Sequence, residues 1–448
     1  MSAPTAAAPP ARLADVDALR GFALLGILVV NITFFGSAFS IYEVADPAYT
    51  AWYDDAARWI VDVLFTSKFY VLFSFLFGYS FTLQLESARR RGVPFTPRFL
   101  RRLAGLFTLG AAHAVLLWQG DILATYAVLG LVLMAARGIR PRRAVVVAAG
   151  LVLLSAAFFV LVAADEAARG VTADTAERIR GATEATAQWR GSPGDVLARR
   201  VSELPATAEL ILVLQAPNAL AMFLLGLAAG KVRLLADPAA LAPRLRRVVA
   251  VGAPLGLLGG IAYAALTIGH AGTPRATLAA AFDVLSAPLL AAAYAAALLL
   301  AFRTPAGARV REALAPAGRM ALTNYLAQSL VCALLFTGYG LGLVGHLRPL
   351  AVLGAAAAVF LVQLPLSAWW LRRHPYGPVE WALRALTHWS RPAWSTAGRR
   401  ARAALPADHP AGRSDQRGAA RCQLGAVSNP GPPGGVKRGG RRTISGGP

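Results

Sequence analysis

Residues 20–36 read Arg-Gly-Phe-Ala-Leu-Leu-Gly-Ile-Leu-Val-Val-Asn-Ile-Thr-Phe-Phe-Gly, an arginine followed by an apolar run that only Asn31 and Thr33 interrupt. A helix needs about 20 apolar residues to cross the hydrocarbon of a bilayer. This run is too long for the apolar region of a signal peptide, and further apolar runs follow it. We therefore interpret residues 20–39 as a retained first transmembrane helix.

The composition extends this interpretation to the whole chain. Of the 448 residues, 56% are hydrophobic and 15% are charged, with a mean hydropathy of +0.52. Soluble domains have about 25% charged residues. Further spans are predicted at residues 61–84, 99–118, 121–136, 143–163, 207–229, 246–268, 277–301, 319–343 and 349–371. The fold class predicted is an all-α, polytopic transmembrane helix bundle with about ten spans.

The loops between these runs alternate in charge. Arginine-rich loops fall at residues 85–102, 137–143, 231–247 and 303–319. The intervening loop 40–58 instead has four carboxylates and one arginine. Because basic loops remain in the cytoplasm, the alternation predicts that both termini are cytoplasmic.

The chain divides into three parts by composition. Residues 1–14 and the Arg/Gly/Pro/Ala-rich tail 391–448 have no apolar period and are predicted to be disordered. Residues 15–390 form the transmembrane domain, with a long polar segment, 164–205, on the extracytoplasmic side.

The net charge of +22 is carried largely by the loops and the tail. It therefore indicates a lipid bilayer as the partner rather than nucleic acid. Cys332 lies inside an apolar span and Cys422 in the tail, which provides no framework for disulfides or a metal site.

Several polar residues fall inside the predicted spans, where an ionisable group is costly and is a candidate for function. Those that map to the outer half of the membrane are Asn31, Lys68, His113, Asp121, Gln215 and Asp283. Their common depth predicts one shared polar cavity that opens outward. The structural alternatives are a packed histidine, a lysine whose ammonium reaches the interface, an ion pair of Asp283 with Lys68 or Arg58, and an asparagine that bonds a neighbouring helix.

Polar residues also gather towards the cytoplasmic side. Arg20, Arg101 and Arg102 lie there, and Asn324 and Gln328 give the ninth span a hydrogen-bonding face towards the bundle interior. Residues 376–388 read as an amphipathic surface helix in which Glu380 and Arg384 are spaced to pair. Phosphate-binding glycine loops, metal-spaced His/Cys groups and nucleophile elbows do not occur in the sequence.

Five blocks of this chain resemble the YeiB-like family of bacterial inner-membrane proteins, a domain of unknown function. They are the opening Asp17-Ala-Leu-Arg-Gly-Phe, Phe73-Ser-Phe-Leu-Phe-Gly, the His113 to Tyr126 segment with its Trp-Gln-Gly-Asp-Ile-Leu core, Gly318-Arg-Met-Ala-Leu-Thr-Asn-Tyr-Leu, and Gly377-Pro-Val-Glu-Trp. The resemblance covers residues 12–390, and it departs where Thr387-His388 replaces Thr-Tyr. It implies a multi-pass protein of the bacterial cytoplasmic membrane.

The opening block is also similar to the first helix of membrane acyltransferases. These include the heparan-alpha-glucosaminide N-acetyltransferase type and bacterial O-acyltransferases of surface glycans, in which a histidine lies near the position of Asn31. This similarity implies transfer of an acyl group from a cytoplasmic donor to an extracytoplasmic acceptor. Acyl-CoA would be a co-substrate and an envelope glycan or small molecule the acceptor, without a bound cofactor or metal.

Under this hypothesis His113 is the general base, because the imidazole of a histidine titrates near neutral pH, and Asp121 or a neighbouring carboxylate orients it. Asn31 or Lys68 stabilises the oxyanion. The residues assigned to substrate binding are Arg20, Arg101, Arg102, Asp283, Gln215, Asn324 and Gln328. Two alternatives remain: a transporter or permease for a small solute, and a non-catalytic membrane scaffold.

Overall fold

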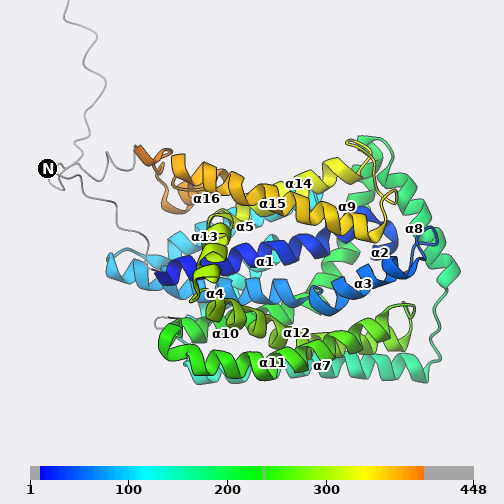
Figure 1. Ribbon diagram of the computed structural model, residues 1–448, viewed down its shortest axis with the longest axis horizontal. Coiled ribbons are helices and arrows are strands. Elements are labelled where there is room, and N and C mark those ends of the chain that lie inside the picture. The colour runs from blue at the N-terminus through cyan, green and yellow to red at the C-terminus, as the bar shows by residue number, and fades with distance from the viewer. Residues whose placement is uncertain (1–10, 236–237, 398–448) are drawn as a thin grey trace, which may run out of the picture. The chain divides into compact units, whose positions relative to one another are not determined.

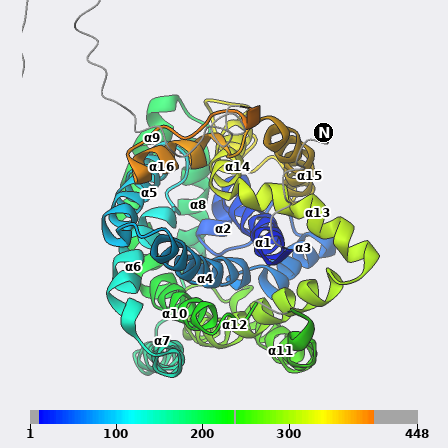
Figure 2. The same cartoon turned by 90° about the vertical axis from the view of Figure 1, so that its left-hand side faces the viewer.

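The computed structural model describes residues 11–235 and 238–397. Within these ranges the chain is built of helices and contains no strand. Most of the helices run alongside one another (Figure 1) and surround α1 (Ala11–Gly36) when seen end-on (Figure 2). The residues of α1 that face the core are apolar and almost completely buried, among them Leu24, Leu28 and Ile32. The predicted all-α bundle is therefore confirmed.

The other helices follow in chain order, with the following bounds: α2 (Ala38–Ile41), α3 (Trp52–Leu64), α4 (Lys68–Arg90), α5 (Phe95–Leu116), α6 (Leu123–Ala135), η1 (Ala136–Gly138), α7 (Pro141–Ala168), α8 (Thr175–Trp189), α9 (Pro193–Leu210), η2 (Ile211–Gln215), α10 (Ala216–Lys231), α11 (Pro238–Thr267), α12 (Pro274–Ala301), α13 (Pro305–Arg319), α14 (Ala321–Phe336), α15 (Pro349–Arg373) and α16 (Pro378–His388).

Among the described residues, eight helical stretches are long and apolar enough to span a membrane. The shorter apolar stretches 123–138 and 321–336 coincide with the predicted fourth and ninth spans. Peripheral helices also expose large apolar side chains: Val146, Leu154 and Leu161 of α7 are 70%, 69% and 69% exposed. Such a surface suits lipid rather than water, so this is a multi-pass membrane protein. The number of spans remains a prediction.

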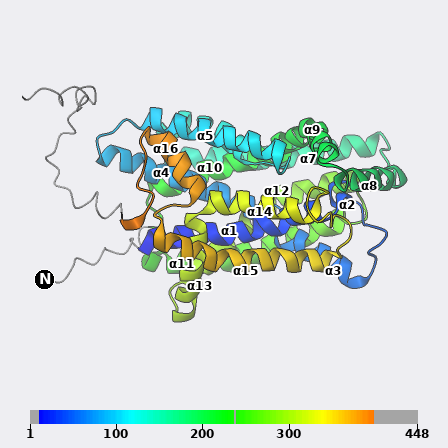
Figure 3. The same cartoon turned by 90° about the horizontal axis from the view of Figure 1, so that it is seen from above.

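The arginine-rich connections α4–α5, α6–α7, α10–α11 and α12–α13 all lie at the left-hand end of the bundle in Figure 1. Helices α8 and α9 lie at the opposite end, whereas α16 packs beside α5 at the arginine-rich end (Figures 1 and 3). We call these the cytoplasmic end and the outer end, following the distribution of basic residues. The cytoplasmic location of the termini remains a prediction.

Glycines bring α1 and α13 into close contact. A Cβ atom on Gly21 would collide with the carbonyl of Leu314, and one on Gly318 would collide with the carbonyl of Asp17. Helix α13 can therefore run across α1 (Figure 1) at a separation that only small residues allow. The contact joins the first and fourth of the five sequence blocks.

The second predicted span, 61–84, is not continuous. Helix α3 ends at Leu64, and α4 begins at Lys68 after Ser67, which has a φ of 66° in the left-handed region. The predicted polar segment 164–205 also contains regular structure, because α8 and α9 occupy most of it. A π-helical turn that ends at Gln215 then joins α9 to α10.

The ends of the ordered chain differ from the prediction. Helix α1 begins at Ala11, so residues 11–14 are helical rather than disordered. At the other end, the Trp394 ring lies 5.2 Å from that of Trp381 and 6.0 Å from that of Trp370, so the chain is still packed beyond residue 391. The predicted disorder of residues 1–10 and 398–448 lies outside the described residues.

The placement of the loops predicts which positions a membrane-impermeant maleimide can reach. In a Cys422→Ser background, Thr172→Cys in the α7–α8 connection should be labelled in intact cells. Ala306→Cys in α13 should be labelled only after permeabilisation, because it lies at the cytoplasmic end. Labelling of Ala306→Cys in intact cells would reverse the assigned orientation.

Candidate functional site

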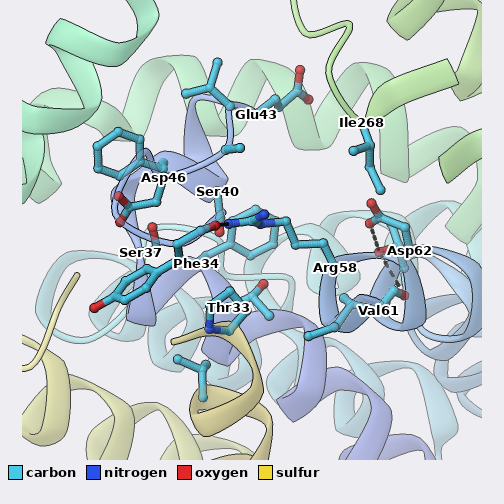
Figure 4. A pocket seen from close by; sticks show the side chains of 18 of the residues that line it. Thr33, Phe34, Ser37, Ser40, Glu43, Asp46, Arg58, Val61, Asp62 and Ile268 are labelled. Atoms are coloured by element: carbon cyan, nitrogen blue, oxygen red, sulfur yellow. Dashed lines mark hydrogen bonds between the residues drawn. The ribbon is translucent and has the colours of Figure 1, made fainter. Parts of the chain in front are cut away.

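A cavity of about 200 Å³ lies at the outer end, bordered by α1, α2, α3, α11 and α15. Its walls combine apolar side chains with a set of polar groups, several of which point into the space in Figure 4. The polar lining residues are Thr33, Ser37, Ser40, Glu43, Asp46, Tyr49, Arg58, Asp62, Thr66, Tyr263 and Thr267. The cavity is therefore a candidate binding site for a small polar molecule.

The break between α3 and α4 lies beside this cavity. Lys68, the first residue of α4, is 0% exposed; its Nζ donates to the backbone oxygen of Asp62 (3.0 Å) and to Asp283 Oδ1 (3.1 Å). The carbonyl of Asp62 has no following helical turn to bond, since α3 ends at Leu64. The structure thus shows the Lys68–Asp283 ion pair that was one of the structural alternatives, and this pair bridges α4 and α12.

His113 and Asp121 form a second buried pair. Nδ1 of His113 lies 2.8 Å from Asp121 Oδ1, and both side chains are 1% exposed. Asp121 Oδ2 accepts the backbone N–H of Ala124 at 2.8 Å, which fixes the carboxylate at the start of α6. A carboxylate only accepts, so Nδ1 carries a proton; in the neutral imidazole Nε2 then carries the lone pair. Nε2 is buried without a hydrogen-bond partner among the described residues.

The His113–Asp121 pair does not open into the cavity, and the prediction of one shared polar cavity is wrong. Trp118, at the turn after α5, packs against Phe35 of α1 with ring centroids 4.5 Å apart, and against Phe34 at 6.1 Å. Phe34 also lines the cavity, whereas neither His113 nor Asp121 does. Depth along separate helices places residues at one level but does not determine which neighbour each side chain faces.

Helix α9 closes the outer side of the His113 turn. Arg200 is 2% exposed and donates to the carbonyl of Leu116 at 2.7 Å. Gln119 donates to Glu203 at 2.8 Å. The turn that holds Asp121 is therefore held by hydrogen bonds from the extracytoplasmic segment.

The two remaining candidate residues in the outer half have no hydrogen-bonding role in the described part of the chain. Asn31 and Gln215 are half-buried, make no side-chain hydrogen bond within the described part of the chain and do not line the cavity. Their predicted roles in oxyanion stabilisation and substrate binding therefore remain predictions.

Asn324 and Gln328 connect α14 to α15. Asn324 Nδ2 donates to Ser367 Oγ (3.0 Å), and Gln328 Nε2 donates to Gln363 Oε1 (2.8 Å). The Gln363 amide donates in turn to the carbonyl of Asn324 at 3.2 Å. These contacts are interhelical hydrogen bonds, and the assigned substrate-binding role remains a prediction.

Glu380 caps α14 instead of making the expected pair with Arg384. Its Oε1 accepts the backbone N–H groups of Leu322 (2.7 Å) and Thr323 (3.0 Å), and its Oε2 accepts the Thr323 hydroxyl at 2.5 Å. A carboxylate at a helix N-terminus satisfies unpaired donors and complements the helix dipole. The Arg384 guanidinium lies over the Tyr376 ring at 4.8 Å. The fourth and fifth sequence blocks thus meet at this cap.

Basic side chains converge at the cytoplasmic end. Arg20 bonds Asp17 at 2.6 Å and also Ser80, and Arg102 lies within electrostatic range of Arg20 and Arg384. The Nε atom of Arg102 is buried without a partner in the described part of the chain. The arrangement therefore retains unused capacity to bind an anion.

The basic cluster extends to α16 along the surface of α5. The Arg101 guanidinium lies 5.6 Å from the Trp389 ring centroid, next to His388 at the end of α16. Partial burial and then the charges of Arg384 and Arg98 lower the pKa of His388 below its ordinary value. The lowered pKa reflects how many basic groups surround α16.

Comparison with known sequences places the chain in a family. Residues 229–390 match the family described as "Protein of unknown function (DUF418)". "Uncharacterized protein YxaH" of Bacillus subtilis (strain 168) is 32% identical over 398 residues, 85% of this chain and 95% of the relative. "Uncharacterized protein YeiB" of Escherichia coli (strain K12) is 32% identical over 403 residues, 84% of this chain and 96% of the relative.

The chain belongs to the DUF418 family. The resemblance to YeiB-like proteins is thereby confirmed. An "Uncharacterized 39.9 kDa protein in amylase 3'region" of Bacillus acidopullulyticus is also similar, at 29% identity over 392 residues, 84% of this chain and 94% of the relative. No solved structure matches the chain. The DUF418 relatives assign no chemistry, so the function has to be argued from the sites above.

Sequence reasoning did not identify the cavity itself. Glu43 and Asp46 are two of the four carboxylates of loop 40–58, which were used only to assign orientation. Carboxylates without neighbouring basic residues are the sequence signal that could have identified this site. Tyr263 and Thr267 come from a distant helix, α11, and show no such pattern.

The buried ion pair predicts a specific pattern of stability. Lys68→Met should destabilise the purified protein by about 3–5 kcal/mol, because it leaves the Asp283 carboxylate buried and unpaired. The double variant Lys68→Met/Asp283→Leu should be more stable than Lys68→Met alone. Unfolding in detergent measures both, and a double variant as unstable as the sum of the single variants would contradict the pairing. Lys231→Met is the control and should cost less, because it removes a hydrogen bond to the Ile139 carbonyl but leaves no buried carboxylate unpaired.

The helix cap predicts a smaller effect. Glu380→Gln should reduce the free energy of unfolding by about 1–2 kcal/mol, because the α14 N-terminus loses a charged acceptor. Glu312→Gln, on the exposed face of α13, should change it by less than about 0.5 kcal/mol. Thermal unfolding of the two variants tests the difference, and equal effects would argue against the cap.

Proposed function

We propose that the protein is a membrane acyltransferase that moves an acyl group from a cytoplasmic thioester to an extracytoplasmic acceptor. The observation that carries this proposal is the His113–Asp121 pair, whose Nδ1···Oδ1 distance is 2.8 Å and whose Nε2 has no partner among the described residues. An oriented histidine with one free nitrogen is the arrangement that general-base catalysis uses. The similarity of the opening block to membrane acyltransferases points to the same chemistry.

The proposed reaction needs one base. Nε2 of His113 takes the proton from an acceptor hydroxyl or amine as its oxygen or nitrogen bonds the acyl carbon. The carbon–sulfur bond of the thioester then breaks, and His113 returns the proton to the leaving sulfur. Asp121 holds the imidazole in one tautomer and stabilises the imidazolium. The Tyr325 ring, whose centroid lies 5.0 Å from that of the imidazole, and the burial of His113 exclude water that would hydrolyse the thioester.

The donor would enter from the cytoplasmic end. Acyl-CoA bears phosphates, and guanidinium groups bind phosphate through paired N–H donors. Arg20, Arg102 and Arg384 gather there. Arg102 and His113 are on the same helix, eleven residues apart, which corresponds to a rise of about 16 Å. Helix α5 would thus connect the donor site to the base.

The assigned orientation sets the cellular context of the proposal. The outer end carries the cavity and the His113 turn, so the acceptor would be an envelope glycan or a small molecule outside the cytoplasm. The bacterial inner membrane is the compartment in which a cytoplasmic acyl-CoA pool and such an acceptor meet. We include that location in the proposal.

Transport of a small solute is a second candidate function. The observation that favours it is the α3–α4 break with the Lys68–Asp283 pair beside an outward cavity. Discontinuous membrane helices with buried charges commonly form solute or ion sites. The two functions depend on different residues, since acyl transfer requires His113 and transport would require Lys68.

The acyltransferase proposal predicts label transfer that depends on the buried pair. Purified full-length protein incubated with labelled acetyl-CoA and extracted envelope glycans should transfer label. His113→Ala should reduce the rate at least about 100-fold, because the base is lost. Asp121→Asn should also reduce it strongly, because the histidine tautomer is no longer fixed.

The control is His346→Ala, an exposed histidine between α14 and α15, which should leave the rate unchanged. Equal transfer by wild type and His113→Ala would refute the role of His113. Absence of transfer from wild type to any envelope fraction would count against acyl transfer and favour the second candidate.

A further inference from the structure

The cavity at the outer end has an unusual charge for this protein. Three carboxylates, Glu43, Asp46 and Asp62, line it, and none forms an ion pair with another described residue. The chain as a whole carries a net charge of +22, so basic partners are abundant elsewhere. Uncompensated carboxylates around one cavity therefore indicate a cationic occupant.

Two basic residues near the cavity are already neutralised. Arg58 donates to Asp55 at 2.6 Å and to the carbonyl of Tyr49 at 2.9 Å. Lys68 is compensated by Asp283 at 3.1 Å.

Arg178 bonds the carbonyl of Tyr42 at 3.0 Å and lies within electrostatic range of Glu43, so it compensates that carboxylate in part. Asp46 and Asp62 keep their charge without a free cation beside them, which leaves a negative electrostatic potential in the cavity.

Each of the two inner carboxylates retains an oxygen for a ligand. Asp62 Oδ1 accepts the Thr66 hydroxyl at 3.0 Å, and Asp46 Oδ1 accepts the backbone N–H of Ala48 at 2.9 Å. The second oxygen of each accepts no hydrogen bond within the described ranges. Asp46 and Asp62 lie on opposite sides of the cavity, with the Arg58 side chain between them (Figure 4).

The rest of the lining suits an organic ion rather than a metal ion. The rings of Phe34, Tyr49 and Tyr263 provide aromatic surface, which attracts ammonium groups. The hydroxyl oxygen of Ser37 is buried without a hydrogen-bond partner in the described part of the chain, and it belongs to the lining. Among the described residues no three His, Cys, Asp or Glu side chains are close enough to hold a metal ion.

The volume limits the size of the occupant. The cavity measures about 200 Å³, whereas an engineered cavity of about 150 Å³ holds benzene. A single six-membered ring therefore fits, but a glycan chain does not fit entirely within it.

We propose that this cavity is a binding site for a small protonated amine of the size of a single ring. Its ammonium group binds the free carboxylate oxygen of Asp62, its carbon skeleton packs on the aromatic lining, and Asp46 adds negative potential from the opposite side of the cavity. The Ser37 hydroxyl supplies a further hydrogen bond. The proposal concerns binding and does not depend on acyl transfer, because His113 is not part of the cavity.

The test compares two molecules of the same shape. Piperidinium carries a ring N–H₂⁺ group where tetrahydropyran has an uncharged oxygen. Calorimetric titration of the full-length protein in detergent should show saturable binding of piperidinium and at least tenfold weaker binding of tetrahydropyran. Micelles without protein provide the blank.

Variants of the lining carboxylates locate the site. Asp62→Asn should weaken piperidinium binding at least tenfold, and Asp46→Asn should weaken it as well, so that failure of one variant to fold leaves the other. Asp165→Asn, an exposed carboxylate on α7 at the outer end, is the matched control and should bind as wild type does. Elution as a single peak in size-exclusion chromatography verifies each variant.

Three results would overturn the proposal. They are no binding of piperidinium to wild type, equal binding of piperidinium and tetrahydropyran, and unchanged binding by both folded carboxylate variants. Label transfer from acetyl-CoA is measured separately, so failure of either proposal is distinguishable from failure of the other.

Discussion

The membrane interior requires that every buried backbone group and every charge find a partner within the protein, and the α3–α4 break shows how this chain meets that requirement. Ending α3 inside the bundle leaves carbonyl groups unpaired, each at a cost of several kcal/mol in hydrocarbon. The Lys68 ammonium bonds the Asp62 carbonyl, and the Tyr294 hydroxyl bonds that of Leu64 at 3.1 Å. Asp283 then balances the lysine charge. One ionic contact therefore stabilises both the break and the α4–α12 interface.

The five sequence blocks that carry the family resemblance are largely explained by contacts between helices. Gly21 and Gly318 allow α1 and α13 to cross closely. Glu380 joins the fifth block to the fourth through Thr323 and the N-terminus of α14. The His113–Asp121 pair lies within the third block. Much of the resemblance thus reflects how the helices pack against one another. His113 is the residue in these blocks that a catalytic role would explain better than packing.

Two separate polar sites result from this packing. The cavity at the outer end is lined by three carboxylates, whereas the His113–Asp121 pair is buried and its turn is bonded to helix α9. Phe34 borders both. If the protein acts on an acceptor held in the cavity, Phe34 or the α1 turn around it would have to move before the base and the acceptor meet. The same separation would suit a protein that binds a solute without chemistry.

The sequence by itself determined the class of fold and its expected orientation, because apolar length and arginine placement are properties of the chain alone. The runs after Arg20 and before Arg372 predicted membrane helices that the structure shows as α1 and α15. Only the tertiary structure decided which polar residues meet: it paired Lys68 with Asp283, used Glu380 to cap α14 and excluded His113 from the cavity. The spacing of residues along a helix gives their depth in the membrane and the side of the helix on which they lie. Which helix that side contacts depends on how helices distant in sequence rotate and pack against one another.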